Sequence, residues 1–141
     1  MSYREKIAWL SLVAMTVTFG PYFALVQLGL VPAGPPPYTR QLLLYSGVVA
    51  AQLLILGLGH LWLRRQAPQE ARLPPDERDR AIGQRSVGAA YSVMIGGMIV
   101  VGCLLPFSAS GWGIVNAALF MIVVAEMVRS ALVVHGYRAQ T

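Results

Sequence analysis

Residues 41–63 read QLLLYSGVVAAQLLILGLGHLWL, and no charged residue occurs between Arg40 and Arg64. A helix of this length crosses the hydrocarbon core of a bilayer, which is roughly 30 Å thick. Three more apolar stretches lie at residues 7–31, 87–107 and 112–134. The pattern predicts an all-α integral membrane protein, a four-helix bundle made of two helical hairpins.

The composition excludes an ordinary soluble domain. Of the 141 residues, 56% are hydrophobic and 12% are charged, whereas soluble domains carry about 25% charged residues. The net charge of +5 comes from arginines that flank the apolar stretches. We therefore assign that charge to contact with membrane lipids and expect no direct binding of nucleic acid. Residues 1–141 are predicted to form a single four-span membrane domain.

The distribution of basic residues predicts the orientation. Six of the eleven Lys and Arg residues lie in one loop, residues 64–86. The two ends of the chain contribute Arg4, Lys6 and Arg138, whereas the other two loops contribute only Arg40. Because Lys and Arg are enriched in cytoplasmic loops, we predict that both termini and residues 64–86 are cytoplasmic.

Residues 74–80 read PPDERDR and predict the start of a helix that runs into the third span. Asp76 is the expected N-cap, with acidic side chains in the first turn. Asp76 and Glu77 are each expected to pair with Arg80 along the helix surface. Two interpretations stay open, a well-capped solvated helix end or a docking surface for a cytosolic regulatory protein. The candidate partner-binding residues are Asp76, Glu77, Arg78, Asp79, Arg80 and Arg85.

Glu126 and Arg129 are an unusual pair, because they lie inside the fourth apolar stretch. Counting back from Val134, Glu126 is roughly 12 Å deep at about 1.5 Å per residue. A charged group at that depth costs about 3 kcal/mol on insertion scales. Glu126 is therefore expected to face the bundle and to have a partner, either Arg129 or one of the polar residues at similar depth, Thr16, Thr18 and Gln52. The pair is interpreted as a structural clamp, a proton- or cation-linked site, or a ligand contact, and the first is favoured.

Small residues at four-residue spacing, Gly88, Ser92 and Gly96, predict close helix packing in the third span. Packing against another span of the same chain is the default, and a homodimer seam is the alternative. Asn116 is expected to make an interhelical hydrogen bond. The sequence offers no nucleophile–base set, metal-ligand cluster or phosphate-binding glycine loop, so we expect no enzymatic activity, catalytic residue, metal or cofactor.

Several motifs carry a resemblance to a known family. They are SYREKIAW at residues 2–9, DERDR at 76–80 with Ile82 and Arg85, Trp112 with Asn116, AEMVR at 125–129, and Tyr137-Arg138. In this order they resemble an uncharacterised family of small four-span bacterial inner-membrane proteins, which often occur beside helix-turn-helix regulators. Ala139 departs from the family, where a further basic residue is expected. The resemblance implies a multi-pass protein of the bacterial inner membrane in a regulatory setting.

Two functional hypotheses follow from the sequence. The first is a non-enzymatic membrane protein that binds a partner, or senses the state of the membrane, through the charged loop at residues 64–86. The second is a small proton- or cation-linked transporter or channel that uses Glu126 and Arg129.

Overall fold

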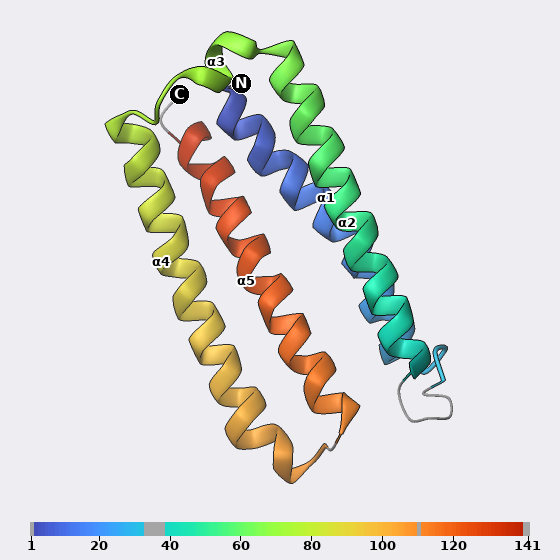
Figure 1. Ribbon diagram of the computed structural model, residues 1–141. Helices are drawn as coiled ribbons and strands as arrows, with labels where there is room; N and C mark the ends of the chain where they lie inside the picture. Colours follow the sequence, from blue (N-terminus) through green and yellow to red (C-terminus); the bar gives the residue numbers. More distant parts are fainter. Residues whose placement is uncertain (1, 33–38, 110, 140–141) are drawn as a thin grey trace.

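The computed structural model describes residues 2–32, 39–109 and 111–139, and these contain no β-strand. The helices, in chain order, are α1 (Tyr3–Gln27), α2 (Thr39–Gln66), α3 (Pro68–Arg72), α4 (Glu77–Ile99), the π-helical turn η1 (Val100–Leu104), the 3₁₀ turn η2 (Leu105–Phe107) and α5 (Trp112–Arg138). Four of them are long, and they lie roughly side by side (Figure 1). The predicted all-α, four-helix architecture is confirmed.

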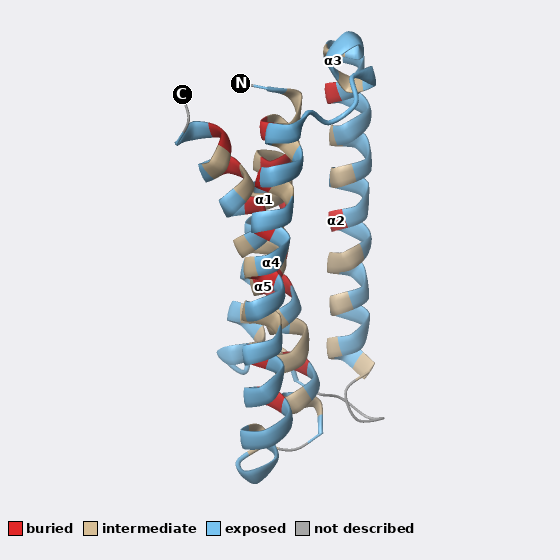
Figure 2. Cartoon of the chain, turned by 90° about the vertical axis from the view of Figure 1, so that its left-hand side faces the viewer, coloured by how far each residue is buried: buried red, intermediate tan, exposed pale blue. Residues whose placement is uncertain are grey.

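The long helices pack in the spatial order α2, α1, α5, α4. Extensive contacts join α1 to α2, α1 to α5, and α4 to α5, so α1 and α5 form the centre of the bundle. Helix α2 has α1 as its main neighbour. Only 6% of the residues in its most apolar part are buried, against 22% in α5, and Figure 2 shows α2 almost entirely in the colours of exposed and intermediate residues.

The outward faces of the long helices are apolar. Leu43, Leu54 and Leu58 of α2 are each about two-thirds exposed, an arrangement that water would not favour. Helices α1, α2 and α5, and α4 with its continuation to Phe107, are each long and apolar enough to cross a membrane. These are the features of a small multi-pass membrane protein.

Helix α1 ends earlier than the apolar stretch predicts, at Gln27 rather than near residue 31. Gly29 has a φ of 67°, a left-handed conformation that ends helices readily because glycine has no Cβ. The N–H of Leu30 donates to the carbonyl oxygen of Leu25, and that of Gly29 to Val26, both at 3.1 Å. This Schellman motif turns the chain away although the residues that follow are still apolar.

Helix α4 begins as predicted. The side chain of Asp76 accepts a hydrogen bond from the N–H of Asp79, and the side chain of Asp79 accepts one from the N–H of Asp76. This reciprocal capping box satisfies two backbone donors at the start of the helix. The helix then continues without a break into the third apolar stretch. The short helix α3, which has Pro68 in its first turn, was not predicted from the sequence.

The packing of α4 corrects one prediction. Gly88, Ser92 and Gly96 are exposed, and a Cβ added at either glycine would meet no neighbouring atom within 4 Å. The neighbouring stripe faces α5 instead, with Ser86, Ala90, Gly97 and Val101 buried. The interpretation of Gly88, Ser92 and Gly96 as a packing stripe within the chain is wrong, because the face of the helix that contains Gly97, and not the one that contains Gly96, lies against α5. The homodimer alternative stays a prediction.

Candidate functional site at the charged end of the bundle

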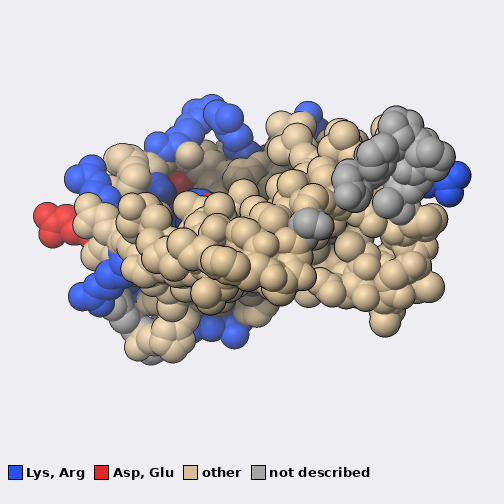
Figure 3. All heavy atoms as spheres, turned by 90° about the horizontal axis from the view of Figure 1, so that it is seen from below, with Lys and Arg blue, Asp and Glu red and all other residues tan. Residues whose placement is uncertain are grey.

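The start of α1, the segment that contains α3, the start of α4 and the end of α5 meet at one end of the bundle (Figure 1). We call this the charged end and define it as residues 2–9, 64–86 and 135–139. It holds nine of the eleven basic residues and five of the six acidic ones, an excess of four positive charges. Figure 3 views the molecule from the opposite end, which presents mostly uncharged residues.

Asp79 is the centre of this end. Its carboxylate pairs with Arg4, whose Nε lies 2.9 Å from Oδ2, and accepts a hydrogen bond from the hydroxyl of Tyr137. Three helices, α1, α4 and α5, are thereby joined by one side chain that is only 17% exposed. Because Asp79 also completes the capping box of α4, one carboxylate sets the start of a helix and the position of its two neighbours.

A second carboxylate joins the two ends of the chain. Glu5 is 7% exposed, and its Oε1 lies 3.3 Å from Nε of Arg138. The guanidinium of Arg138 also lies over the ring of Trp9, 5.1 Å from its centroid, a cation–π contact. Ser2 accepts a hydrogen bond from the N–H of Glu5 and so caps α1. Burial of Glu5 is tolerated because its charge is paired.

The segment between α2 and α4 is attached to the start of α1, and the first turn of α4 is attached to the end of α5. Glu70 of α3 accepts a hydrogen bond of 3.0 Å from the N–H of Tyr3. Arg4 donates to the carbonyl oxygen of Leu73 at 3.2 Å, and Arg78 donates to that of Tyr137 at 3.3 Å. Residues that are 59 to 69 positions apart in the sequence are thus fixed on one surface.

The structure distributes the predicted partner-binding residues over three faces of α4. Asp79 lies toward α1 and α5, and Asp76 caps the helix. Glu77 and Arg80 are exposed on a second face with Gln84, which lies one further turn along. The ion pairs that were expected between Arg80 and Asp76 or Glu77 are not among those of the described residues. The acidic side chains that form ion pairs at this end are Asp79 and Glu5, and they contact arginines of other helices.

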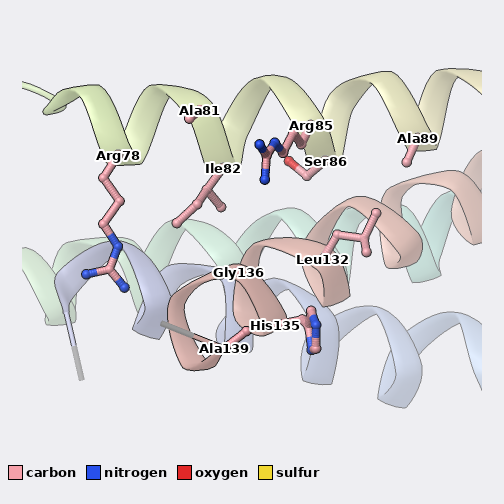
Figure 4. Close-up of a pocket in the computed structure, with 10 residues that line it drawn as sticks. All are labelled: Arg78, Ala81, Ile82, Arg85, Ser86, Ala89, Leu132, His135, Gly136 and Ala139. Carbon is pink, nitrogen blue, oxygen red and sulfur yellow. The ribbon is translucent and has the colours of Figure 1, made fainter. Parts of the chain in front are cut away.

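Arg78 and Arg85 occupy the third face, two turns apart. They line a groove of about 650 Å³ between α4 and α5, opposite His135. Figure 4 shows Arg78 reaching from α4 toward the end of α5, and Ile82 and Leu132 pointing into the space between the two helices. Ser86, also on the groove, is buried and donates to the carbonyl oxygen of Gly83. The groove is therefore basic along its sides and apolar at its base.

Glu126 and Arg129 do form an ion pair, with Nη1 of Arg129 2.9 Å from Oε2 of Glu126. Their side chains are 43% and 50% exposed. The expectation that Glu126 faces the interior of the bundle is therefore wrong. Because the two groups are one helical turn apart, they neutralise each other on the surface of α5 and need no partner from another span.

Of the other polar candidates, Thr18 and Gln52 bond to each other, whereas Thr16 and Asn116 bond to residues outside the predicted set. Thr18 donates to Oε1 of Gln52 at 2.7 Å and joins α1 to α2, whereas Thr16 donates to Leu12 of its own helix. Asn116 makes the predicted interhelical hydrogen bond, since its Oδ1 accepts from the hydroxyl of Tyr22 at 2.7 Å. Its Nδ2 donates to Gln41 at 3.4 Å. The polar contacts that join the helices within the bundle are therefore Thr18 with Gln52 and Asn116 with Tyr22 and Gln41.

Sequence reasoning missed Glu5, Tyr22 and Tyr137, which carry the contacts among helices. Two signals point to Glu5 and Tyr137. Ser2 and Glu5 have the spacing of a capping box, and both chain ends share the predicted membrane side with the arginine-rich loop. Because many arginines gather at this end, a carboxylate such as that of Glu5 is expected to form an ion pair with an arginine of another helix.

The chain matches no family model, no curated protein and no solved structure. The resemblance to a family of small four-span inner-membrane proteins stays a prediction. Among the residues that the structure describes, no group of three or more His, Cys, Asp and Glu side chains is arranged to hold a metal ion.

Proposed function

We propose that this protein is a small, non-enzymatic protein of the bacterial inner membrane that binds a cytosolic regulatory partner through one face of α4. The face consists of Glu77, Arg80 and Gln84, and we call it the partner face. The observation that carries the proposal is that the side chains of Glu77 and Arg80 are exposed and make no ion pair or hydrogen bond with the described part of the chain, while that of Asp79, on the same turn, bonds to Arg4 and Tyr137.

The surrounding contacts support this assignment because they hold the partner face in place. Asp79, Arg4 and Tyr137 fix the first turn of α4 against α1 and α5. A surface that is ordered before binding loses less conformational entropy when a partner binds. Charged side chains of both signs also favour selection of a partner by complementary charge.

The proposal is tested by exchanging the two charges. The variant Glu77→Arg with Arg80→Glu keeps the net charge of the charged end, so its attraction to anionic lipids is retained. We expect a cytosolic protein that co-purifies with the native chain to lose at least about tenfold in recovery, a difference of roughly 1.4 kcal/mol. Recovery is measured by quantitative mass spectrometry after solubilisation of the membrane.

The matched control is Arg64→Gln with Arg65→Gln, which removes two exposed charges from α2 at the same end. It should leave recovery of the partner unchanged. The proposal is wrong if the exchanged variant and the native chain recover the same cytosolic proteins in the same amounts.

Transport through Glu126 and Arg129 is the alternative, and the geometry gives it less support. A proton- or cation-linked site needs a carboxylate on a path through the bundle. The carboxylate of Glu126 lies on the outer surface of α5 and is already paired with Arg129.

A further inference from the structure

The groove between α4 and α5 has a composition that the partner face does not explain. Arg78 and Arg85 from α4 and His135 from α5 line it, and no acidic residue does so. Ala81, Ile82, Ala89 and Leu132 supply its apolar part. Two guanidinium groups beside an apolar surface match an amphiphile whose head is anionic and whose tail is hydrocarbon.

The position of the groove along the helices matters as much as its composition. Arg78 and Arg85 precede the third apolar stretch, which begins near residue 87, and Ala89 lies inside it. On α5, Leu132 lies inside the fourth apolar stretch, and His135 and Gly136 follow its end. The groove therefore crosses the expected boundary between hydrocarbon and headgroups. Its basic side chains lie at the level where lipid phosphates are found.

We propose that this groove binds an anionic phospholipid of the surrounding membrane. The lipid phosphate lies between the guanidinium groups of Arg78 and Arg85, and one acyl chain lies along Ala89 and Leu132. Basic pockets between membrane helices on the cytoplasmic side are a recurrent form of lipid recognition. The inference rests on the membrane placement in the proposed function, and it is independent of the cytosolic partner.

Arg85 is the residue on which the site depends most. Arg78 already donates to the carbonyl oxygen of Tyr137 and lies 5.8 Å from the centroid of its ring. Arg85 is exposed, and its side chain has no hydrogen bond or ion pair with the residues that the structure describes. Figure 4 shows Arg85 on the helix α4 side of the groove. Guanidinium groups bind phosphate oxygens in a planar, two-point geometry, so Arg85 is available for that role.

The test uses the full-length chain purified in a neutral detergent. Phosphatidylglycerol and phosphatidylcholine with identical acyl chains are titrated, and lipid-bound protein is counted by native mass spectrometry. We expect phosphatidylglycerol to bind more tightly. Arg85→Gln should weaken its binding about fivefold, and Arg78→Gln with Arg85→Gln about 25-fold, because each basic residue near a membrane surface contributes a factor of that size.

Three controls decide the outcome. Arg64→Gln with Arg65→Gln removes the same charge outside the groove and should change the affinity by less than about twofold, so an equal loss in this variant overturns the site in favour of diffuse attraction. Equal binding of the two lipids by the native chain also overturns it. Inorganic phosphate should not displace phosphatidylglycerol, and complete displacement would mean that the groove takes a free anion.

Two further measurements distinguish a loss of lipid binding from a loss of folding or of partner binding. The melting temperature without added lipid should be the same for Arg85→Gln and the native chain, since Arg85 makes no bond within the described residues. The exchange of Glu77 and Arg80 should leave lipid affinity unchanged. A negative result in the lipid experiment alone contradicts the lipid site and leaves the proposal of a partner face unaffected. A negative result in the partner experiment alone contradicts the partner face and leaves the lipid site unaffected.

Discussion

Two polar clusters join the same central helices at opposite ends of the bundle, and they are built from different chemistry. Toward the end away from the charges, Tyr22, Asn116 and Gln41 bond through neutral hydroxyl and amide groups. At the charged end, Asp79 and Glu5 bond through ionised groups to Arg4 and Arg138. The difference indicates where water reaches the protein. Neutral groups are used where desolvating a charge is most costly, and ions are used where water and headgroups solvate their exposed sides.

The degree of burial follows the same division. Tyr22 is 1% exposed and packs edge-on against Phe23 and Tyr45, with ring centroids 5.0 and 5.3 Å apart. The arginines of the charged end remain partly exposed, Arg4 at 36% and Arg138 at 59%. The neutral cluster should therefore be insensitive to salt, whereas the charged cluster should weaken as ionic strength rises.

The largest effect is expected from Asp79→Ala, which breaks the charged cluster at its centre. The variant loses the capping contact to Asp76, the hydrogen bond from Tyr137 and the ion pair with Arg4. We expect a loss of about 2–3 kcal/mol in the free energy of unfolding, measured by denaturant titration in mild detergent. Part of this loss should disappear at 0.5 M salt.

Glu77→Ala is the control for Asp79→Ala, because Glu77 is in the same helical turn and its exposed side chain bonds to none of the described residues. It should change stability by less than about 0.5 kcal/mol. Equal losses in the two variants would show that Asp79 does not hold the helices together.

A smaller effect is expected from Asn116→Leu, which breaks the neutral cluster. The hydroxyl of Tyr22 then loses its acceptor in a buried site, so we expect a loss of about 1–2 kcal/mol by the same titration. The loss should be the same at low and high salt. A strong dependence on salt would contradict the division between the clusters, and Ser92→Ala on the exposed face of α4 is the control.

The smallest effect is expected from Gln52→Leu. Nε2 of Gln52 is buried and has no hydrogen-bond partner among the described residues. The single hydroxyl hydrogen of Thr18 is within reach of both Gln52 and Ala14, so it can donate to the carbonyl oxygen of Ala14 when the amide is removed. Replacing a half-satisfied amide by an apolar group of similar size is close to neutral. We expect a change within about 0.5 kcal/mol, and a loss as large as that of Asn116→Leu would show that the bond between α1 and α2 is essential.

The sequence predicts the helices well because their signals are local. The uncharged interval between Arg40 and Arg64 indicates α2, and Asp76 with Asp79 indicates the start of α4. The interhelical bond of Asn116 also follows from its amide in an apolar helix. Each of these predictions requires only the residue and its immediate neighbours.

The sequence predicts the inward faces of the helices poorly, and the physical reason is the solvent. A helix in water shows its core side as an apolar stripe, but a helix in hydrocarbon is apolar on all sides. Nothing in the sequence therefore distinguishes Gly97, which lies against Met121, from Gly96, which faces outward. The same ambiguity explains why Glu126 was expected inside the bundle. The pairing of Glu5 with Arg138 spans 133 positions and has no local signal.

The contact between α1 and α5 has a consequence for the order of assembly. Helices α2 and α4 lie between them in the sequence, so the interface of α1 and α5 cannot form until residues 112–138 have been synthesised. Until then the carboxylate of Glu5 has no guanidinium from Arg138, and the hydroxyl of Tyr22 has no amide from Asn116. A hairpin of α1 and α2 therefore forms before its central partner exists, and the contacts of α1 with the rest of the bundle are completed only when α5 has been translated.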